Sequence, residues 1–345
     1  MPRSGELTAS WALHAPGLLA AGALLCTALI VLLRPLFTHY AVARPNSRSS
    51  HKLPTPQGGG IAVVAATIAV SGGSIYFWPA GIADGGQFAI VVAAVALIAL
   101  VGVLADIHPQ NIAPRLLLQT LAVATVIFAL PVDLRTLPIV PWWVERAALV
   151  IGGLWFVNLV NFMDGLDWMT VAEVIPITAA LATIGCLGLL PPQQTGVSLA
   201  LCGATIGFAF FNRPVAALFL GDVGSLPIGL ILGWLLISLA GEGGRVAAIL
   251  LPLYYLADST ITLVRRAASG ERLWQAHRSH FYQRATDRGF AVIEVVARVF
   301  VVNITLAALA LVTVLWPSCE LDIAALIVGP ALVAWLLFAL ARGPR

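Results

Sequence analysis

The stretch Asn158-Leu-Val-Asn-Phe-Met-Asp-Gly-Leu-Asp-Trp-Met-Thr170 lies where two strongly apolar runs of the chain meet. Both the run before it, 147–157, and the run after it, 171–190, are apolar enough to belong to membrane spans. A charged side chain at the centre of a membrane helix costs about 2.5 to 3.5 kcal/mol on insertion scales. The stretch is therefore expected at the water-facing end of two neighbouring spans, where polar groups serve a function.

Four oxygen-bearing side chains recur every third residue in this stretch: Asn158, Asn161, Asp164 and Asp167. On a continuous helix this spacing would place them along one slowly turning face. Carboxylate and amide oxygens are the ligands that Mg²⁺ prefers, so the pattern favours a magnesium site. The simpler alternative is that Asp164 and the following glycine form a turn and that the asparagines cap helices.

The composition identifies an integral membrane protein of the all-α class. Of its 345 residues 60% are hydrophobic and 10% are charged, and the mean hydropathy is +0.95. Apolar runs of about 17 to 25 residues predict a single polytopic domain, 1–345, with about eleven spans, or ten if two short spans merge. The predicted spans are 16–33, 59–78, 88–105, 115–131, 145–162, 170–190, 196–211, 224–240, 246–264, 291–315 and 322–341.

The basic residues predict the orientation of these spans. With the N-terminus outside, fourteen of the 19 Lys and Arg residues fall on the cytoplasmic side, four fall on the other side, and one, Arg298, lies within a span. The net charge of +3 then reflects membrane topology, and it does not indicate nucleic-acid binding.

The same topology places every chemically promising polar segment on the cytoplasmic side, in 44–60, 104–115, 158–168, 212–225 and 258–284. In contrast, the loops 79–87, 132–144 and 241–245 on the other side are short and are predicted to be chemically plain. An active site at the cytoplasmic face is therefore expected.

The first of these segments combines basic residues and hydroxyls with the glycine triplet 58–60. Arg48, His51 and Thr55 precede the triplet, which opens the next predicted span. Glycines at a helix N-terminus let backbone N–H groups approach a phosphate, so an anionic ligand is expected here. A stiff turn before the span is an equally good interpretation.

The other segments supply carboxylates and further phosphate-binding groups. Asp106 and Asp222 each stand at the end of a predicted span, and each could instead be a helix cap. His277, Arg278 and His280 give three donors within four residues, which suits a pyrophosphate. Basic residues beside a membrane are also expected from topology and from anionic lipids, although the histidines are not.

Four motifs in this order resemble the polyprenyl-phosphate N-acetylhexosamine-1-phosphate transferases of glycosyltransferase family 4. The resemblance is strongest over residues 34–290, and the four motifs are found at 48–60, 158–167, 219–229 and 276–283. The His-x-x-His-x-Tyr-Gln form of the last motif is most similar to the branch that starts O-antigen and other surface polysaccharides.

The resemblance implies an activity. It implies a Mg²⁺-dependent enzyme of the bacterial inner membrane that transfers a sugar-1-phosphate from a UDP-sugar to undecaprenyl phosphate in the bilayer and releases UMP. The sugar is expected to be an N-acetylhexosamine or a deoxy derivative, and the resemblance is compatible with a homodimer.

The resemblance also implies residue roles. Asp222 would be a Mg²⁺ ligand, with the amide oxygen of Asn161 as a second. Asp106, Asp164, Asp167, His277 and His280 would act in catalysis, Asp164 and Asp167 by holding the nucleotide and shaping the metal site, and the two histidines by binding phosphate. The remaining residues are expected to bind substrate: Arg48, His51, Thr55, Asn158, Asn161, Asn212 and Arg278.

The chain departs from the family pattern at two positions. Ala105 replaces the first residue of an Asp-Asp pair whose second member is Asp106, and Trp168 stands where a glycine is usual. Because neighbouring helical residues point about 100° apart, Asp106 alone can suffice. The alternatives are a family member with reduced activity, a multi-spanning transporter, and, more remotely, a CDP-alcohol phosphotransferase.

Overall fold

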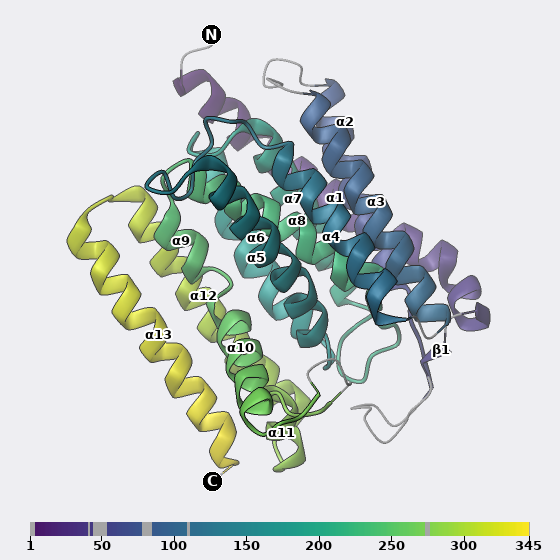
Figure 1. Cartoon of the computed structure of the whole chain (residues 1–345). Coiled ribbons are helices and arrows are strands. Elements are labelled where there is room, and N and C mark those ends of the chain that lie inside the picture. Colours follow the sequence, from purple (N-terminus) through teal and green to yellow (C-terminus); the bar gives the residue numbers. More distant parts are fainter. Residues whose placement is uncertain are drawn as a thin grey trace.

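The computed structural model of the chain describes residues 4–40, 42–43, 54–77, 85–108, 111–272 and 277–344. Within these ranges the molecule is a bundle of helices (Figure 1). The helices are α1 (Ser4–Tyr40), α2 (Gly59–Phe77), α3 (Gly85–Ile107), α4 (Ile112–Phe128), α5 (Trp142–Met163), α6 (Met169–Cys186), α7 (Pro192–Ala209), α8 (Asp222–Gly241), α9 (Arg245–Leu250), α10 (Leu253–Ala268), α11 (Phe281–Asp287), α12 (Val292–Leu315) and α13 (Cys319–Arg342). Two short strands, β1 (Val42–Ala43) and β2 (Thr55–Pro56), pair antiparallel.

The all-α membrane class is confirmed. Among the described residues, seven helices have the length and apolar composition needed to cross a membrane. They are α1, α3, α5, α6, α8, α12 and α13, and the shorter α2 and α4 are also apolar. Every predicted span has a helical counterpart, and the eleven-span count and the orientation stay predictions.

The ninth predicted span, 246–264, is not one helix. It is divided into α9 and α10 by a turn at Leu251 and Pro252. Proline has no N–H to donate within a helix, and its ring clashes with the preceding turn, which explains the break. The apolar composition runs through the break and therefore conceals it.

Helices α6 and α8 form the interior of the bundle. Most residues of both helices are buried, from Met169 to Gly185 in α6 and from Val223 to Leu239 in α8. Helix α8 packs against α3 and α5, and α6 packs against α7 and α12. The first turn of α8 is thereby held beside the last turns of α3 and α5.

Helix α1 begins at the upper end of the bundle in Figure 1, and α13 ends at the lower end. An odd number of membrane crossings requires this arrangement. Helix α11 also lies at the lower end, together with the end of α10.

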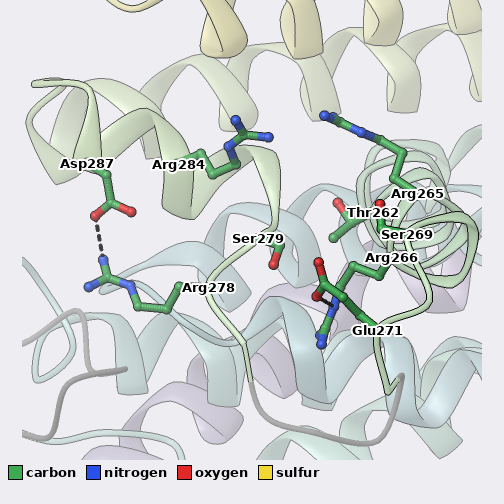
Figure 2. Close-up of a pocket in the computed structure, with 9 residues that line it drawn as sticks. All are labelled: Thr262, Arg265, Arg266, Ser269, Glu271, Arg278, Ser279, Arg284 and Asp287. Carbon is green, nitrogen blue, oxygen red and sulfur yellow. Dashed lines mark hydrogen bonds and ion pairs between the residues drawn. The ribbon is translucent and has the colours of Figure 1, made fainter.

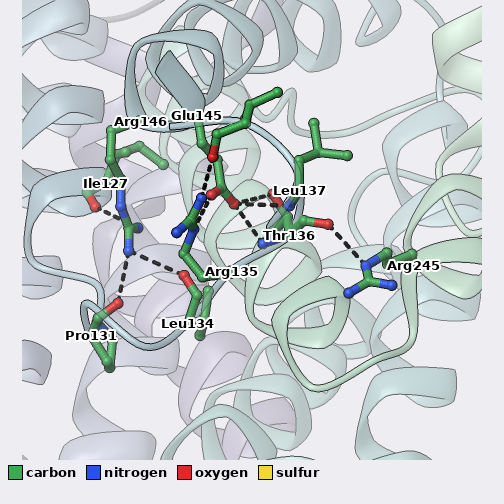
Figure 3. A network of polar contacts seen from close by, with 10 residues as sticks. Ile127, Pro131, Leu134, Arg135, Thr136, Leu137, Glu145, Arg146 and Arg245 are labelled. Atoms are coloured by element: carbon green, nitrogen blue, oxygen red, sulfur yellow. Dashed lines mark hydrogen bonds and ion pairs between the residues drawn. The ribbon is translucent and has the colours of Figure 1, made fainter. Parts of the chain in front are cut away.

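The loop between α4 and α5 lies at the other end of the bundle. This loop was predicted to be chemically plain, and the prediction is wrong because the loop takes part in a buried network of charged groups. Glu145 is 1% exposed, and its carboxylate accepts hydrogen bonds from the Arg135 guanidinium and from the backbone N–H of Thr136 and of Leu137 (Figure 3). The fully buried Arg146 donates to the carbonyls of Ile127, Pro131 and Leu134. Arg245 donates to the carbonyl of Thr136 and so ties α9 to this network.

Candidate active site

Three side chains from three helices meet at the lower end of the bundle. Asn161, near the end of α5, donates from Nδ2 to Asp222 Oδ1 of α8 at 2.8 Å and to Ser225 Oγ at 2.8 Å. Arg115, in the first turn of α4, approaches Asp222 Oδ2 at 3.0 Å and Asn161 Oδ1 at 3.3 Å. Residues separated by more than 100 positions in the chain thus form one polar cluster, which remains partly exposed.

Arg115 was not assigned a role by the sequence, although it lies at the centre of this cluster. Its guanidinium contacts one oxygen of Asp222 and one of Asn161, the two residues that the resemblance selects as metal ligands. A usable signal was present, because Arg115 follows Asp106 by nine residues at the end of a polar segment, 104–115, that was predicted to lie on the side of the active site.

Asp106, at the end of α3, holds the N-terminus of α8. Its Oδ1 accepts the backbone N–H of Asp222 at 2.9 Å, and its Oδ2 accepts that of Val223 at 3.1 Å. The carboxylate therefore caps a helix, as the simpler interpretation had it, but the helix is one that begins 116 residues later. Since both oxygens are occupied, the contact positions the backbone that carries Asp222.

The oxygens at Asp222 and Asn161 are compatible with a magnesium ion. Mg²⁺ typically takes one or two carboxylates and completes its shell with water and substrate phosphates. In the described part of the chain, no three His, Cys, Asp or Glu side chains gather closely enough to hold a metal alone. A cation at Asp222 and Asn161 would thus depend on substrate oxygens, and it would share or replace the position of the Arg115 guanidinium.

The four-residue face predicted for 158–167 is wrong beyond Met163. Helix α5 ends there, and Asp164 is its C-cap residue. The Asp164 carboxylate accepts a hydrogen bond from the Thr170 hydroxyl, whereas Asp167 Oδ2 accepts the backbone N–H of Ala216 at 3.0 Å. Only the two asparagines share a helix, and the two aspartates fix the turn between α5 and α6, as the turn interpretation predicted.

Asp164 lies in the turn between two candidate spans and is partly buried. Burial raises the pKa of its carboxyl to about 7, although the hydrogen bond from Thr170 lowers the pKa and the nearby Asp222 carboxylate raises it further. Of the acids predicted for the site, Asp164 is thus one whose charge state changes near neutral pH.

Two further asparagines are engaged within the protein. Asn158 Nδ2 donates to Gln119 Oε1 at 2.9 Å, which connects α5 to α4. Asn212 is buried, accepts the backbone N–H of Trp168 at 2.8 Å and donates to the carbonyl of Leu218 at 3.0 Å. These contacts join the turn after α5 to the loop before α8, and substrate contact by either asparagine stays a prediction.

Trp168 shows why a glycine is usual at its position. Its φ of 63° lies in the left-handed region, where bulky residues are rare and strained. The indole Nε1 donates to the carbonyl of Ala209 at 2.7 Å, and this contact together with the Asn212 bond holds the residue in place.

The glycine triplet 58–60 does not offer its N–H groups to an anion. The N–H groups of Gly58 and Gly59 donate to the carbonyl of Phe219, and that of Gly60 donates to the carbonyl of Leu220. A Cβ on Gly60 would lie 2.1 Å from Gly224 Cα, so the glycine is needed for close packing against α8. The phosphate-binding expectation for the triplet is wrong, and the turn interpretation is the better one.

The other residues of that segment are only partly described. Thr55 is buried in β2, where it pairs with Ala43. Arg48 and His51 lie outside the described residues. Next to Thr55, Gln57 donates from Nε2 to the carbonyl of Asp106 at 3.1 Å and links the segment to the end of α3.

The histidine motif is organised by a buried aspartate. Asp258 of α10 is fully buried; its Oδ1 lies 3.2 Å from His280 Nδ1 and accepts the N–H of Phe281 at 3.0 Å. His280 stacks on His277, and the buried Nε2 of His280 has no hydrogen-bond partner in the described part of the chain. A ring fixed through Nδ1 with Nε2 available is suited to meet a phosphate oxygen.

Asp258 is a second residue that the sequence analysis left without a role. It stands inside an apolar run, and an ionisable residue in a predicted span is by default a functional candidate. Its partner His280 lies 22 residues further on, beyond the reach of any local spacing rule.

Tyr282 connects the histidine motif to the turn after α5. Its hydroxyl donates to the carbonyl of Phe162 at 2.9 Å, and the side chain is fully buried. A Cβ on Gly165 would lie 2.1 Å from that hydroxyl, so this position requires glycine. The structure thus joins the regions of Asp164 and His280. Arg278, in contrast, forms an ion pair with Asp287 at 3.0 Å.

Comparison with known proteins finds sequences similar to this chain. A family model described as glycosyl transferase family 4 matches residues 88–240, a segment that contains Asp106, Asn161 and Asp222. A probable undecaprenyl-phosphate N-acetylglucosaminyl 1-phosphate transferase of Bacillus subtilis is 27% identical over 73% of this chain and 71% of its own length.

Two further relatives are similar. A decaprenyl-phosphate N-acetylglucosaminephosphotransferase of Mycolicibacterium smegmatis is 29% identical over 72% of this chain and 69% of its own. A phospho-N-acetylmuramoyl-pentapeptide-transferase of Rhodopseudomonas palustris is 28% identical over 45% of this chain and 47% of its own.

Proposed function

Because the chain is a member of glycosyl transferase family 4, we propose that it is an enzyme that transfers a sugar-1-phosphate from a UDP-sugar to a polyprenyl phosphate in the membrane. The acceptor is undecaprenyl phosphate, and the sugar is an N-acetylhexosamine or a deoxy derivative. The reaction starts a lipid-linked surface polysaccharide at the cytoplasmic face of a bacterial inner membrane.

The observation that carries this proposal is the convergence of Arg115, Asn161 and Asp222 beside the Asp106 cap. Phosphoryl transfer depends mainly on alignment and on the neutralisation of charge, and this cluster supplies a cation, a carboxylate and an amide at one point. His280 adds a nitrogen whose orientation is fixed by Asp258.

The chemistry balances without a protein nucleophile. An oxygen of the acceptor phosphate attacks the β-phosphorus of the UDP-sugar, the bond from that phosphorus to the bridging oxygen breaks, and UMP leaves with the electron pair. The acceptor is mostly dianionic at pH 7, because the second pKa of a phosphate monoester is about 6. The protein therefore has little need of a strong base at this step.

Each residue of the cluster then has a defined task. Arg115 neutralises and orients phosphate oxygens, Asp106 holds the α8 N-terminus, and His280 Nε2 contacts a phosphate. A Mg²⁺ ion held at Asp222 and Asn161 would add further neutralisation of phosphate charge when bound. The surrounding turns are held in position by Asp164, Asp167 and Asn212.

The test is a reconstitution. Purified protein is incubated with undecaprenyl phosphate, Mg²⁺ and a panel of UDP-N-acetylhexosamines and deoxyhexosamines, and the lipid product is identified by its mass. The expected product is heavier than the acceptor by one sugar phosphate, with one UMP released per product. UDP-sugar transport into sealed vesicles without any lipid product would refute the proposal.

Ala105 gives a second test within the same assay. Because Asp106 alone already caps α8, Ala105→Asp is expected to change turnover by less than about tenfold. Turnover that appears only in the substituted protein would mean that Asp106 does not suffice and that the natural chain has lost activity.

A further inference from the structure

A polar cavity lies between the end of α10 and α11, apart from the cluster around Asp222. Its volume is about 360 Å³, and Figure 2 shows the side chains that line it. Four of them are arginines, Arg265, Arg266, Arg278 and Arg284. None of the residues that form the Asp222 cluster lines this cavity, although Arg278 and Ser279 of the histidine motif do.

The acids of the cavity balance only half of its positive charge. Arg266 pairs with Glu271 at 2.8 Å, and Arg278 pairs with Asp287 at 3.0 Å. In the part of the chain that the structure describes, no ion pair includes Arg265 or Arg284. The cavity therefore carries an excess of two positive charges.

These two arginines extend toward one another from opposite sides of the cavity (Figure 2). Arg265 comes from the last turn of α10, where it also lies over the Phe281 ring at 5.5 Å, and Arg284 comes from α11. Two guanidinium groups that face each other repel unless an anion lies between them. Planar guanidinium forks match phosphate oxygens best, and the hydroxyls of Ser269 and Ser279 add donors in the same cavity.

The surface beside the cavity is apolar. Ile261 and Val264 of α10 are 41% and 62% exposed, and Ile261 lies one helical turn before Arg265 on the same face. A basic group at the edge of an exposed apolar helix face is the pattern of a segment at the membrane surface. A soluble anion would make no use of this apolar face, whereas the chains of a lipid would cover it.

We propose that this cavity binds the phosphate headgroup of an anionic membrane lipid. The phosphate lies between Arg265 and Arg284, and the hydrocarbon chains lie along Ile261 and Val264. This binding does not depend on the transfer reaction.

The test measures lipid retention on the full chain. The protein in neutral detergent is mixed with equal amounts of phosphatidylglycerol and phosphatidylcholine, and native mass spectrometry counts the lipids that remain bound. Phosphatidylglycerol is expected to be retained preferentially. Arg265→Gln combined with Arg284→Gln should lower its affinity about 25-fold, since each arginine near a membrane surface contributes roughly a fivefold factor.

The matched control is Arg288→Gln, which removes an exposed arginine just after α11 that does not line the cavity. Its lipid affinity should match that of the natural protein, and an equal loss in the control would overturn the proposal. Equal retention of phosphatidylcholine, or release of phosphatidylglycerol by millimolar inorganic phosphate, would also overturn it. If thermal unfolding shows that the double variant is not folded, the single variant Arg284→Gln is the test. Its affinity for phosphatidylglycerol is expected to fall roughly fivefold.

Discussion

The two ends of the bundle both contain arginines, acids and amide or hydroxyl groups, yet they use them differently. Beside the α4–α5 loop, the carboxylate of Glu145, in the first turn of α5, is 1% exposed and accepts hydrogen bonds from Thr136 and Leu137 of that loop. At the other end, the side chains of Arg115 and Asp222 are 23% and 29% exposed. A polar network that closes on itself stabilises a fold, whereas one that remains partly open can bind a ligand.

The largest expected effect is a loss of stability at the closed network, which would distinguish a structural network from a ligand-binding one. Replacing Glu145→Ala leaves Arg135 and two backbone N–H groups without their acceptor, so the free energy of unfolding should fall by about 3 kcal/mol. Thermal unfolding in detergent measures the change. Glu242→Ala, an exposed acid after α8, should change stability by less than about 0.5 kcal/mol. A loss of turnover at unchanged stability would mean that the α4–α5 loop is functional.

The next effect is on turnover. Asp222→Asn removes the charge that Arg115 contacts, and kcat should fall about 100- to 1000-fold while the thermal midpoint stays close to that of the natural protein. Asp133→Asn, an exposed acid at the other end of the bundle, is the control and should retain full turnover. If stability falls in parallel with turnover, the cluster is structural like the α4–α5 network.

A smaller effect is expected at Asp258, which acts through another residue. Asp258→Asn should lower kcat about 10- to 100-fold, because His280 loses the carboxylate that orients its ring. Steady-state kinetics of Asp258→Asn, His280→Gln and the double variant measure the coupling. The double variant should lose no more than the worse single variant, and independent, multiplying losses would contradict a positioning role.

The smallest effect concerns pH. The pKa of Asp164 is raised to about 7 by burial, so the folded protein holds a proton there that the unfolded chain releases near its ordinary value of 3.8. This group therefore lowers stability as pH rises from about 4 to 7. The thermal midpoint of Asp164→Asn relative to the natural protein should increase across this range. A constant difference would show that Asp164 is already ionised at low pH.

Hydropathy predicted the helices well because burial in a membrane requires long apolar segments, and every predicted run corresponds to one helix except 246–264, which corresponds to two. It missed the break at Pro252 because the apolar composition continues on both sides. The spacing rule failed at Asp164 because it assumes an unbroken helix, while the chain turns after Met163 so that Tyr282 can reach the Phe162 carbonyl.

The pairings of the candidate site were beyond the reach of local patterns. Arg115 meets Asp222 across 107 positions of the chain, and Asp258 meets His280 only after α10 has ended. Charge counts predicted one side of the membrane for these segments, but only the packing of α4 beside α8, and of the chain before α11 against α10, determines which residues touch.

The Arg115 guanidinium gives the site its own counter-ion. A resting protein whose acid is already neutralised has no need to recruit a divalent ion in order to fold, and so its heat resistance should be the same in a chelator as in magnesium buffer. Metal would then be bound only by the complex with substrate, and a fall in the free magnesium of the cell would leave the protein folded.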